Sequence, residues 1–229
     1  MNTKHKKPTL TKKQRHKLRV QQVRRQKIFL TCLFLLIVGC ILLRFSKFSG
    51  RQKETHQINA ACEAYRDEVS SEAAQYDMSD YVDLILAVMM QESSGQGTDP
   101  MQSSEGAYNT RYPQQPNGIT DPSYSISCGI QELKYALEKA VCTGPTDLSK
   151  IRLALQAYNF GADSYFAYLE ENGQTVWTAQ SAQAFAQMAS DGTQRDEDDP
   201  LHDPAGPWDY GDQYYPDHVL RYYHLDNNS

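Results

Sequence analysis

The chain has 229 residues, which is enough for one ordinary domain with additional segments. Its five cysteines are too few to indicate a disulfide framework in a chain of this length. The formal net charge of −5 conceals an asymmetry. Residues 1–27 hold eleven Lys and Arg and no acid, whereas residues 54–229 hold eight Lys and Arg against 28 Asp and Glu, a charge of −20. The sequence therefore predicts a basic tail joined to an acidic body.

An apolar segment over residues 28–44 separates the tail from the body. A helix that spans a bilayer needs roughly 20 apolar residues, and the nearby Phe45 and Phe48 can lengthen this segment. The positive-inside rule leaves the basic tail, residues 1–27, in the cytoplasm. We therefore expect a single-pass protein of the cell membrane, with a signal anchor at 28–44, a stalk at 45–60 and an extracellular domain at 61–229.

Three other readings of the N-terminal region are weaker. A cleaved signal peptide is disfavoured because no small-x-small cleavage site closely follows the apolar run. The segment "IVGC" ending at Cys40 resembles a lipoprotein cleavage box, but apolar residues continue after the cysteine. The basic tail could bind nucleic acid. The membrane reading already explains its charge, so we expect no nucleic-acid partner.

The body shows helical periodicity and no convincing strand pattern. A long segment rich in Gly, Pro, Ser, Asn and Gln interrupts it at residues 95–128, and a loop this long in a compact domain is usually functional. The sequence predicts an all-α fold of roughly six to eight helices. The expected helices cover residues 61–76, 79–92 with Ser79 as N-cap, 129–142, 148–160 between Asp147 and Gly161, 163–171, 178–189 and 216–223.

Glu92 is the unusual residue of the second expected helix. The spacing of Ile85, Val88, Met89 and Glu92 places them on one helical face, so a carboxyl group lies where an apolar helix ends. Burial and the negative helix C-terminus would both raise the pKa of this carboxyl. A protonated acid suits proton donation to a leaving oxygen. The simpler reading is an exposed Glu at a fraying helix end.

The cysteines and histidines indicate neither a bridge nor a cofactor. If one helix separates Cys128 from Cys142, their Cα atoms lie about 20 Å apart, whereas a disulfide needs less than about 7 Å. Either the two do not pair or that helix is broken, and the state of Cys62 is left open. No Cys or His residues have metal-ligand spacing, so we expect no metal and no other cofactor.

Three motifs occur in order at expected helix boundaries: "ES" at Glu92, "CGIQ" at Cys128 and "AYNFG" at Ala157. Together they resemble the superfamily of goose-type lysozymes and soluble lytic transglycosylases. The likeness is closer to the lysozyme-like domain of CwlT-type wall hydrolases, which belong to conjugative elements of Gram-positive bacteria, and covers about residues 60–225. No peptidase domain follows in this sequence, so the resemblance implies no peptidase activity here.

The resemblance also implies roles for individual residues. Glu92 would be the general acid, and Asp99, in "QGTDP", would be the second catalytic carboxylate. The substrate-binding residues would be Ser93, Gln102, Gln131, Tyr158 and Asn159, with the backbone near Gly129.

Each of these roles has a structural alternative. Asp99 before a proline could be a turn residue, with Glu105 and Asp121 next in line as the second carboxylate. Tyr158 could belong to the core and Asn159 could end its helix. Gln131 could satisfy the first turn of its own helix.

The implied activity is hydrolysis of the peptidoglycan strand between N-acetylmuramic acid and N-acetylglucosamine. It would open the wall locally for a conjugation or secretion channel, with conjugative type IV secretion components as possible partners. A lytic transglycosylase, which forms anhydromuramic ends with Glu92 alone, is the main alternative. Such enzymes carry Gly-Leu-Met-Gln where this chain reads Cys-Gly-Ile-Gln. A non-catalytic wall-binding scaffold is the other.

The charge asymmetry predicts the topology of the chain. Because eleven uncompensated basic residues precede the apolar segment, protease added to intact protoplasts should remove a tag placed after Ser229 and spare a tag at Met1. The reverse protection pattern would show that the orientation is wrong.

Overall fold

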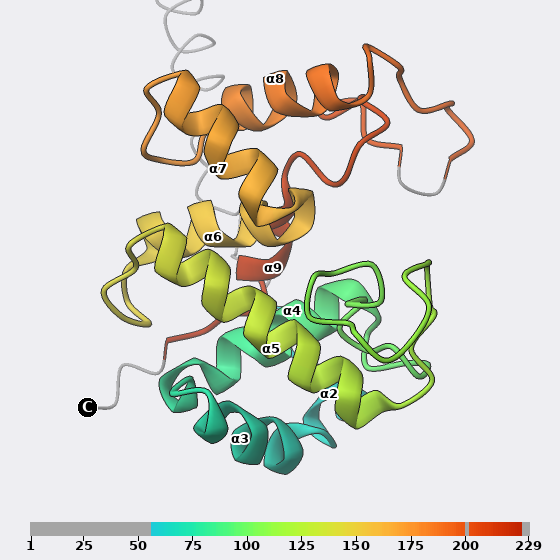
Figure 1. Cartoon of the computed structure of the whole chain (residues 1–229), viewed down its shortest axis with the longest axis vertical. Helices are drawn as coiled ribbons and strands as arrows, with labels where there is room; N and C mark the ends of the chain where they lie inside the picture. Colours follow the sequence, from blue (N-terminus) through green and yellow to red (C-terminus); the bar gives the residue numbers. More distant parts are fainter. Residues whose placement is uncertain (1–55, 200–201, 226–229) are drawn as a thin grey trace, which may run out of the picture. The chain divides into compact units, whose positions relative to one another are not determined.

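The structure is a computed structural model that describes residues 56–199 and 202–225. The expected tail and anchor, and residues 45–55 of the stalk, lie outside the described residues. Within the described ranges, no helix is both long and apolar enough to cross a bilayer. The described part of the chain forms one helical unit without named strands, as the sequence predicts, apart from an isolated bridge between Gln194 and Trp208 (Figure 1).

The first half of the unit contains short helices around one apolar helix. In chain order they are α2 (Ala60–Glu63), α3 (Arg66–Gln75), the 3₁₀ turn η1 (Ser79–Tyr81) and α4 (Val82–Glu92). The expectation of one helix over 61–76 is wrong, because the chain turns between α2 and α3, where the Tyr65 N–H donates to Cys62 O at 3.0 Å. Ser79 begins η1 and is not the N-cap of α4.

The central pair of helices is α5 (Pro122–Lys139) and α6 (Leu148–Phe160), which pack against each other. Helix α5 begins seven residues earlier than the sequence predicts, since Ile126 continues the buried stripe of Ile130 and Leu133. The stretch before Cys128 is rich in serine, which is a poor helix former, and this hid the start of the helix. Helix α6 begins and ends as expected.

The caps of α6 explain that agreement. The Asp147 side chain accepts from the Lys150 N–H at 3.3 Å, and Gly161 ends the helix with a φ of 83°.

The remaining helices of the described chain are α7 (Ala162–Glu171), α8 (Ala179–Ala189) and α9 (Tyr215–Leu220). Thr178 and Ser181 form a capping box at the start of α8.

Helix α4 forms the centre of the core. Six consecutive residues of this helix, from Leu84 to Met89, are fully buried, so every one of its faces is covered. Helices α3 and α9 both pack against it. This brings α9, near the end of the described chain, against the helix that carries Glu92 (Figure 1).

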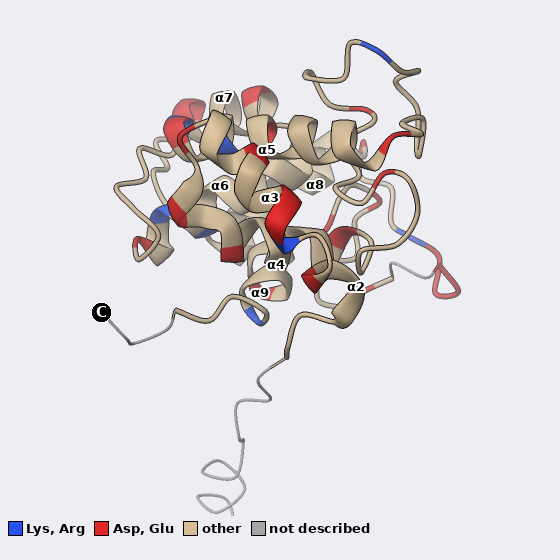
Figure 2. Ribbon diagram, turned by 90° about the horizontal axis from the view of Figure 1, so that it is seen from below, with Lys and Arg blue, Asp and Glu red and all other residues tan. Residues whose placement is uncertain are grey.

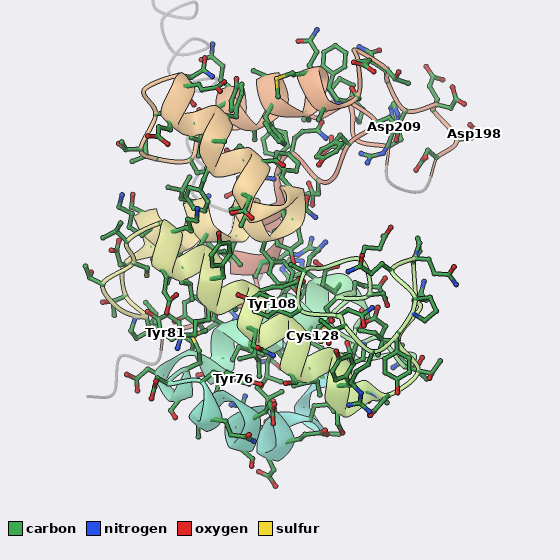
Figure 3. All side chains as sticks on the ribbon, viewed as in Figure 1. Tyr76, Tyr81, Tyr108, Cys128, Asp198 and Asp209 are labelled. Atoms are coloured by element: carbon green, nitrogen blue, oxygen red, sulfur yellow. The ribbon has the colours of Figure 1, made fainter. Side chains whose placement is uncertain are left out.

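The cysteines of the described region are free thiols, and Cys128 lies on the unbroken helix α5 (Figure 3). Of the two alternatives that the sequence leaves open, an unpaired Cys128 and Cys142 or a broken helix, the structure has the first. Acidic residues are distributed over most of the described helices (Figure 2). Surface charge alone therefore does not mark the functional site.

Val141 follows α5 in a conformation that normally requires glycine. Its φ is 57° and the residue is 70% exposed, although its spacing from Ile130, Leu133 and Leu137 would put it on the apolar face of a helix continued to Cys142. The Cys142 N–H bonds to Leu137 O and the Val141 N–H bonds to Glu138 O, both at 3.0 Å, which defines a Schellman motif.

Replacing this residue should stabilise the fold. Val141→Gly removes the Cβ clash of the left-handed conformation and should raise the free energy of unfolding by about 1 kcal/mol, or the melting temperature by about 2–4 °C. Val141→Ala, which removes only the branch, should gain less. A lower melting temperature for the glycine variant in a thermal scan would contradict this reading of the turn.

Candidate active site

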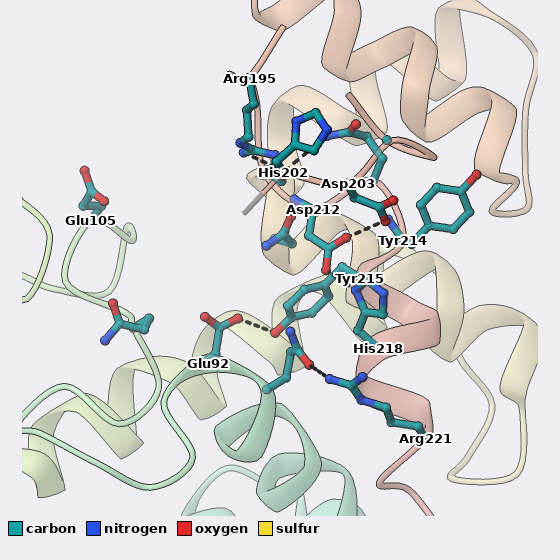
Figure 4. A pocket seen from close by; sticks show the side chains of 16 residues that line it. Glu92, Glu105, Arg195, His202, Asp203, Asp212, Tyr214, Tyr215, His218 and Arg221 are labelled. Atoms are coloured by element: carbon teal, nitrogen blue, oxygen red, sulfur yellow. Dashed lines mark hydrogen bonds and ion pairs between the residues drawn. The ribbon is translucent and has the colours of Figure 1, made fainter. Parts of the chain in front are cut away.

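Glu92 is the last residue of α4 and faces a tyrosine from α9. Because the preceding turns of α4 are wholly buried, the helix delivers this carboxyl group from the core to the edge of a pocket. Its Oε1 accepts a hydrogen bond from the Tyr215 hydroxyl (Figure 4). Tyr215 is 2% exposed and stacks on Tyr158, with ring centroids 6.4 Å apart. Two tyrosines therefore close the apolar side of Glu92.

The surroundings favour the protonated form of Glu92. Its pKa is raised from 4.5 to about 7, and burial is the largest cause. The hydrogen bond from Tyr215 opposes this rise, whereas the charges of Asp212 and then Asp99 add to it. The pKa of Tyr215 is also raised well above its usual value, mainly by burial, so the phenol keeps its proton and remains a donor. A carboxylic acid is thus available near neutral pH.

The pocket beside Glu92 has a volume of about 720 Å³. Four parts of the chain line it: the end of α4, the loop between α4 and α5, Asn159 near the end of α6, and a C-terminal set made of Arg195 and residues between His202 and Arg221. In Figure 4, Glu105 lies on the loop side, while Asp212 and His218 lie on the opposite side, near Tyr215. The pocket is open between these walls and is wide enough to take sugar rings.

Asp99 belongs to the loop between α4 and α5, but it is not part of the pocket wall. Its side chain is 1% exposed. Its Oδ1 accepts from the Ser103 N–H at 3.1 Å and the Ser125 hydroxyl at 2.6 Å, and its Oδ2 accepts from the Ser104 N–H and hydroxyl. The carboxylate of Asp99 thus accepts four hydrogen bonds. Because the donors belong to the loop and to α5, these bonds connect the loop to α5.

Two of the expected binding residues hold the same loop from other sides. The Ser93 hydroxyl donates to Pro100 O at 2.8 Å, and the Tyr158 hydroxyl donates to Met101 O at 2.9 Å. Gln102 lies between these anchors with a φ of 47°, lines the pocket and donates to Asn117 Oδ1 at 3.1 Å. The loop therefore presents Gln102 to the pocket from a fixed backbone.

Gly129 and Gln131 lie outside the pocket wall. A Cβ on Gly129 would lie 2.6 Å from Met101 Cβ, so the loop packs directly on α5 at this glycine. The Gln131 side chain donates to Ser127 O at 3.1 Å within its own helix.

The other expected residues divide between the pocket and its surroundings. Asn159 and Glu105 line the pocket, and Glu105 is exposed on the loop. Asp121 precedes α5 as its N-cap residue, without a capping bond from its side chain, and is not in the pocket wall. Of the expected residues, the structure thus brings together Glu92, Gln102, Asn159 and Glu105.

Sequence reasoning missed the pocket wall formed by Arg195 and by residues between His202 and Arg221. Asp212 and Tyr215 lie in this wall. Both come just before the short helix that the sequence predicts at residues 216–223. The segment "GDQYYP" has no helical period, although its aromatic residues so close to a proline-initiated helix were a usable signal of burial.

The structure thus places a half-buried, hydrogen-bonded acid at the end of an apolar helix, beside an open pocket in an all-α domain. The family model described as "Lysozyme-like" matches residues 60–223. The chain belongs to the lysozyme-like family.

Individual relatives are similar over part of their length. The bifunctional muramidase/DL-endopeptidase CwlT of Bacillus subtilis is 35% identical over 169 residues, covering 74% of this chain and 44% of that protein. The membrane protein YocA of the same species is 40% identical over 115 residues, covering 48% and 45%. A Staphylococcus aureus structure described as similar to a lipoprotein of the NLP/P60 family has a TM-score of 0.62 at 27% identity, covering 76% and 56%. The chain thus spans about half the length of these relatives.

The contacts of Asp99 predict its effect on stability. Asp99→Asn keeps the shape of the side chain but leaves one acceptor oxygen for four donors, so the free energy of unfolding should fall by about 2–3 kcal/mol. Asp121→Asn is a matched control that should change it by less than about 0.5 kcal/mol. Urea denaturation measures both. Equal stability of the two variants would show that the four donors do not hold the loop.

Proposed function

We propose that this chain cleaves the glycan strands of peptidoglycan as a muramidase, hydrolysing the bond between N-acetylmuramic acid and N-acetylglucosamine. The observation that carries the proposal is the Glu92 carboxyl group, whose pKa burial raises to about 7 at the edge of an open pocket. Family membership and the similarity to a named muramidase support the choice of substrate.

Glu92 is the general acid in this proposal. Its proton passes to the glycosidic oxygen as the bond to the anomeric carbon breaks, and Tyr215 then stabilises the carboxylate by its hydrogen bond. The surrounding apolar helix and the two tyrosines exclude water from the far side of the acid. Gln102 and Asn159, which line the pocket, hold the sugar substituents.

Asp99 acts in this proposal as a positioning residue. The four donors on its carboxylate leave no free oxygen to face a sugar. By fixing residues 99–104 it holds Gln102 against the pocket, together with Ser93 and Tyr158. Gln131 and Gly129 contribute in the same indirect way, through α5.

A lytic transglycosylase is the second candidate, and the burial of Asp99 favours it. That reaction needs only one carboxyl group, which first donates a proton and then accepts one from the sugar's own hydroxyl. Mass spectrometry of digested glycan strands distinguishes the two. Hydrolysis gives reducing muramic ends, one water heavier than the anhydro ends of a transglycosylase.

The location of the protein is a separate part of the proposal. Residues 28–44 anchor it in the cell membrane, so that residues 61–229 reach the wall. The resemblance to CwlT-type enzymes adds the proposal that the opened wall admits a conjugation channel. Conjugation genes beside the gene for this chain would support that role.

Glu92→Gln tests the acid directly. The amide keeps the shape of the side chain but cannot donate a proton as a carboxylic acid does, so clearing of purified cell walls should slow by about 10²-fold or more. Glu171→Gln is a matched control because Glu171 also ends a helix, α7, but is exposed. Near wild-type clearing by Glu92→Gln would remove this residue from the mechanism.

The fold of the Glu92→Gln variant should persist. The pKa of Glu92 is higher in the folded state, so ionising this buried group costs stability as the pH rises from about 4.5 through about 7. The amide removes that cost. Above pH 7 the variant should therefore melt at or above the wild-type temperature, which separates lost catalysis from lost structure.

A further inference from the structure

A hydrolase needs a second group to activate water, and the wall opposite the loop offers Asp212. The pocket is lined by four carboxyl groups: Glu92, Glu105, Asp203 and Asp212. Glu105 is exposed on the loop, and Asp203 accepts the Ala205 N–H at 2.8 Å in a local turn. Asp212 differs from both because side chains of α6 hold its backbone.

Both polar backbone groups of Asp212 are bonded to α6. Its N–H donates to Asn159 Oδ1 at 2.7 Å, and its carbonyl oxygen accepts from Gln156 Nε2 at 2.8 Å. Gln156 is fully buried and also accepts from the Trp177 indole at 2.9 Å. A buried polar side chain used in this way fixes the position of Asp212 within the non-helical segment before α9.

Gly211 permits this close approach. Its φ is 49°, and a Cβ there would lie 2.6 Å from Asn159 Oδ1 and 2.7 Å from the Phe160 ring. Any side chain at this position would push the chain away from α6 and displace Asp212. The "AYNFG" motif thus ends α6 at Gly161 and also holds the pocket wall that carries Asp212, through Asn159 and Phe160.

The carboxylate of Asp212 is also held in place. Its Oδ1 accepts from the Tyr214 N–H at 2.9 Å, and its Oδ2 lies 2.5 Å from His218 Nδ1, on α9 (Figure 4). That bond is the largest effect raising the pKa of His218, with burial and Arg221 opposing it and Asp203 adding to it. Asp212 also raises the pKa of Glu92 more than Asp99 does.

We propose that Asp212, oriented by His218, is the carboxylate that accepts a proton from the attacking water while Glu92 protonates the leaving oxygen. The inference rests on the proposed hydrolysis. The water oxygen bonds to the anomeric carbon, the bond from that carbon to the glycosidic oxygen breaks, and the Glu92 proton goes to that oxygen. The water proton goes to Asp212, so one water is consumed and the two carboxyl groups exchange protonation states.

The test compares Asp212→Asn with Asp198→Asn in the full chain. Asp198 is an exposed residue of the chain before Asp212 and does not line the pocket (Figure 3 labels its position). We expect Asp212→Asn to lower kcat on purified peptidoglycan by about 10²-fold or more. Binding to insoluble peptidoglycan should be retained, and Asp198→Asn should be unchanged.

His218 variants keep the proposal testable if Asp212→Asn folds poorly. His218→Leu leaves the carboxylate without its partner on Oδ2, and kcat should fall by about tenfold or more. His218→Asn, which keeps a donor near that oxygen, should recover most of the rate. Equal rates for both His218 variants would show that the bond to Asp212 does not matter for turnover.

The products separate failure of this inference from failure of the proposed function. Wild-type products with anhydro ends would overturn hydrolysis itself. If the wild type releases reducing ends and folded Asp212→Asn retains more than about a third of its rate, Asp212 is not the base and the muramidase proposal stands.

Discussion

The hydrogen bond between Tyr215 and Glu92 is the contact on which the site depends. It joins residues that lie 123 positions apart, from the helix that forms the centre of the core and from α9. Because Tyr215 is almost completely buried, its hydroxyl can reach Glu92 only when α9 is packed against α4. The packing of α9 against α4 therefore positions both the acid and the opposite wall of the pocket.

The loop before α5 depends on a different constraint, the burial of charge. A carboxylate as inaccessible as that of Asp99 is costly unless donors satisfy it, and serines from the loop and from α5 supply them. The loop is long and polar, yet it is tied at Pro100, at Met101 and at Asp99. This explains how a segment rich in Gly, Pro and Ser can present Gln102 in a fixed position.

The parts of the fold that were predictable have local causes. Asp147 and Gly161 mark the ends of α6, and the apolar spacing before Glu92 places that acid at the end of a buried helix, as the structure has it. The start of α5 was not predictable from propensity, because its first turns are rich in serine and the bond from Ser125 to Asp99 is a tertiary contact that the local sequence does not reveal.

The opposite wall of the site could not be predicted for a related reason. Asp212 lies in a segment without periodicity, and its position follows from tertiary bonds to Gln156 and Asn159. The sequence around Asp99 is polar and gives no sign that its carboxylate is buried, whereas in the structure Ser103 and Ser104 fold back as its donors. In both cases the composition is visible in the sequence, but the partners of each group are set by the fold.

The central claim is that burial keeps Glu92 protonated near neutral pH while a buried tyrosine bonds to it. A carbon-detected NMR titration of the Glu92 carboxyl group, assigned by comparison with Glu92→Gln, measures this without any substrate. The account predicts a pKa of about 7, and a still higher value in Tyr215→Phe, since the tyrosine hydrogen bond lowers it. A wild-type value near 4.5, the ordinary value for a solvated Glu, would contradict it.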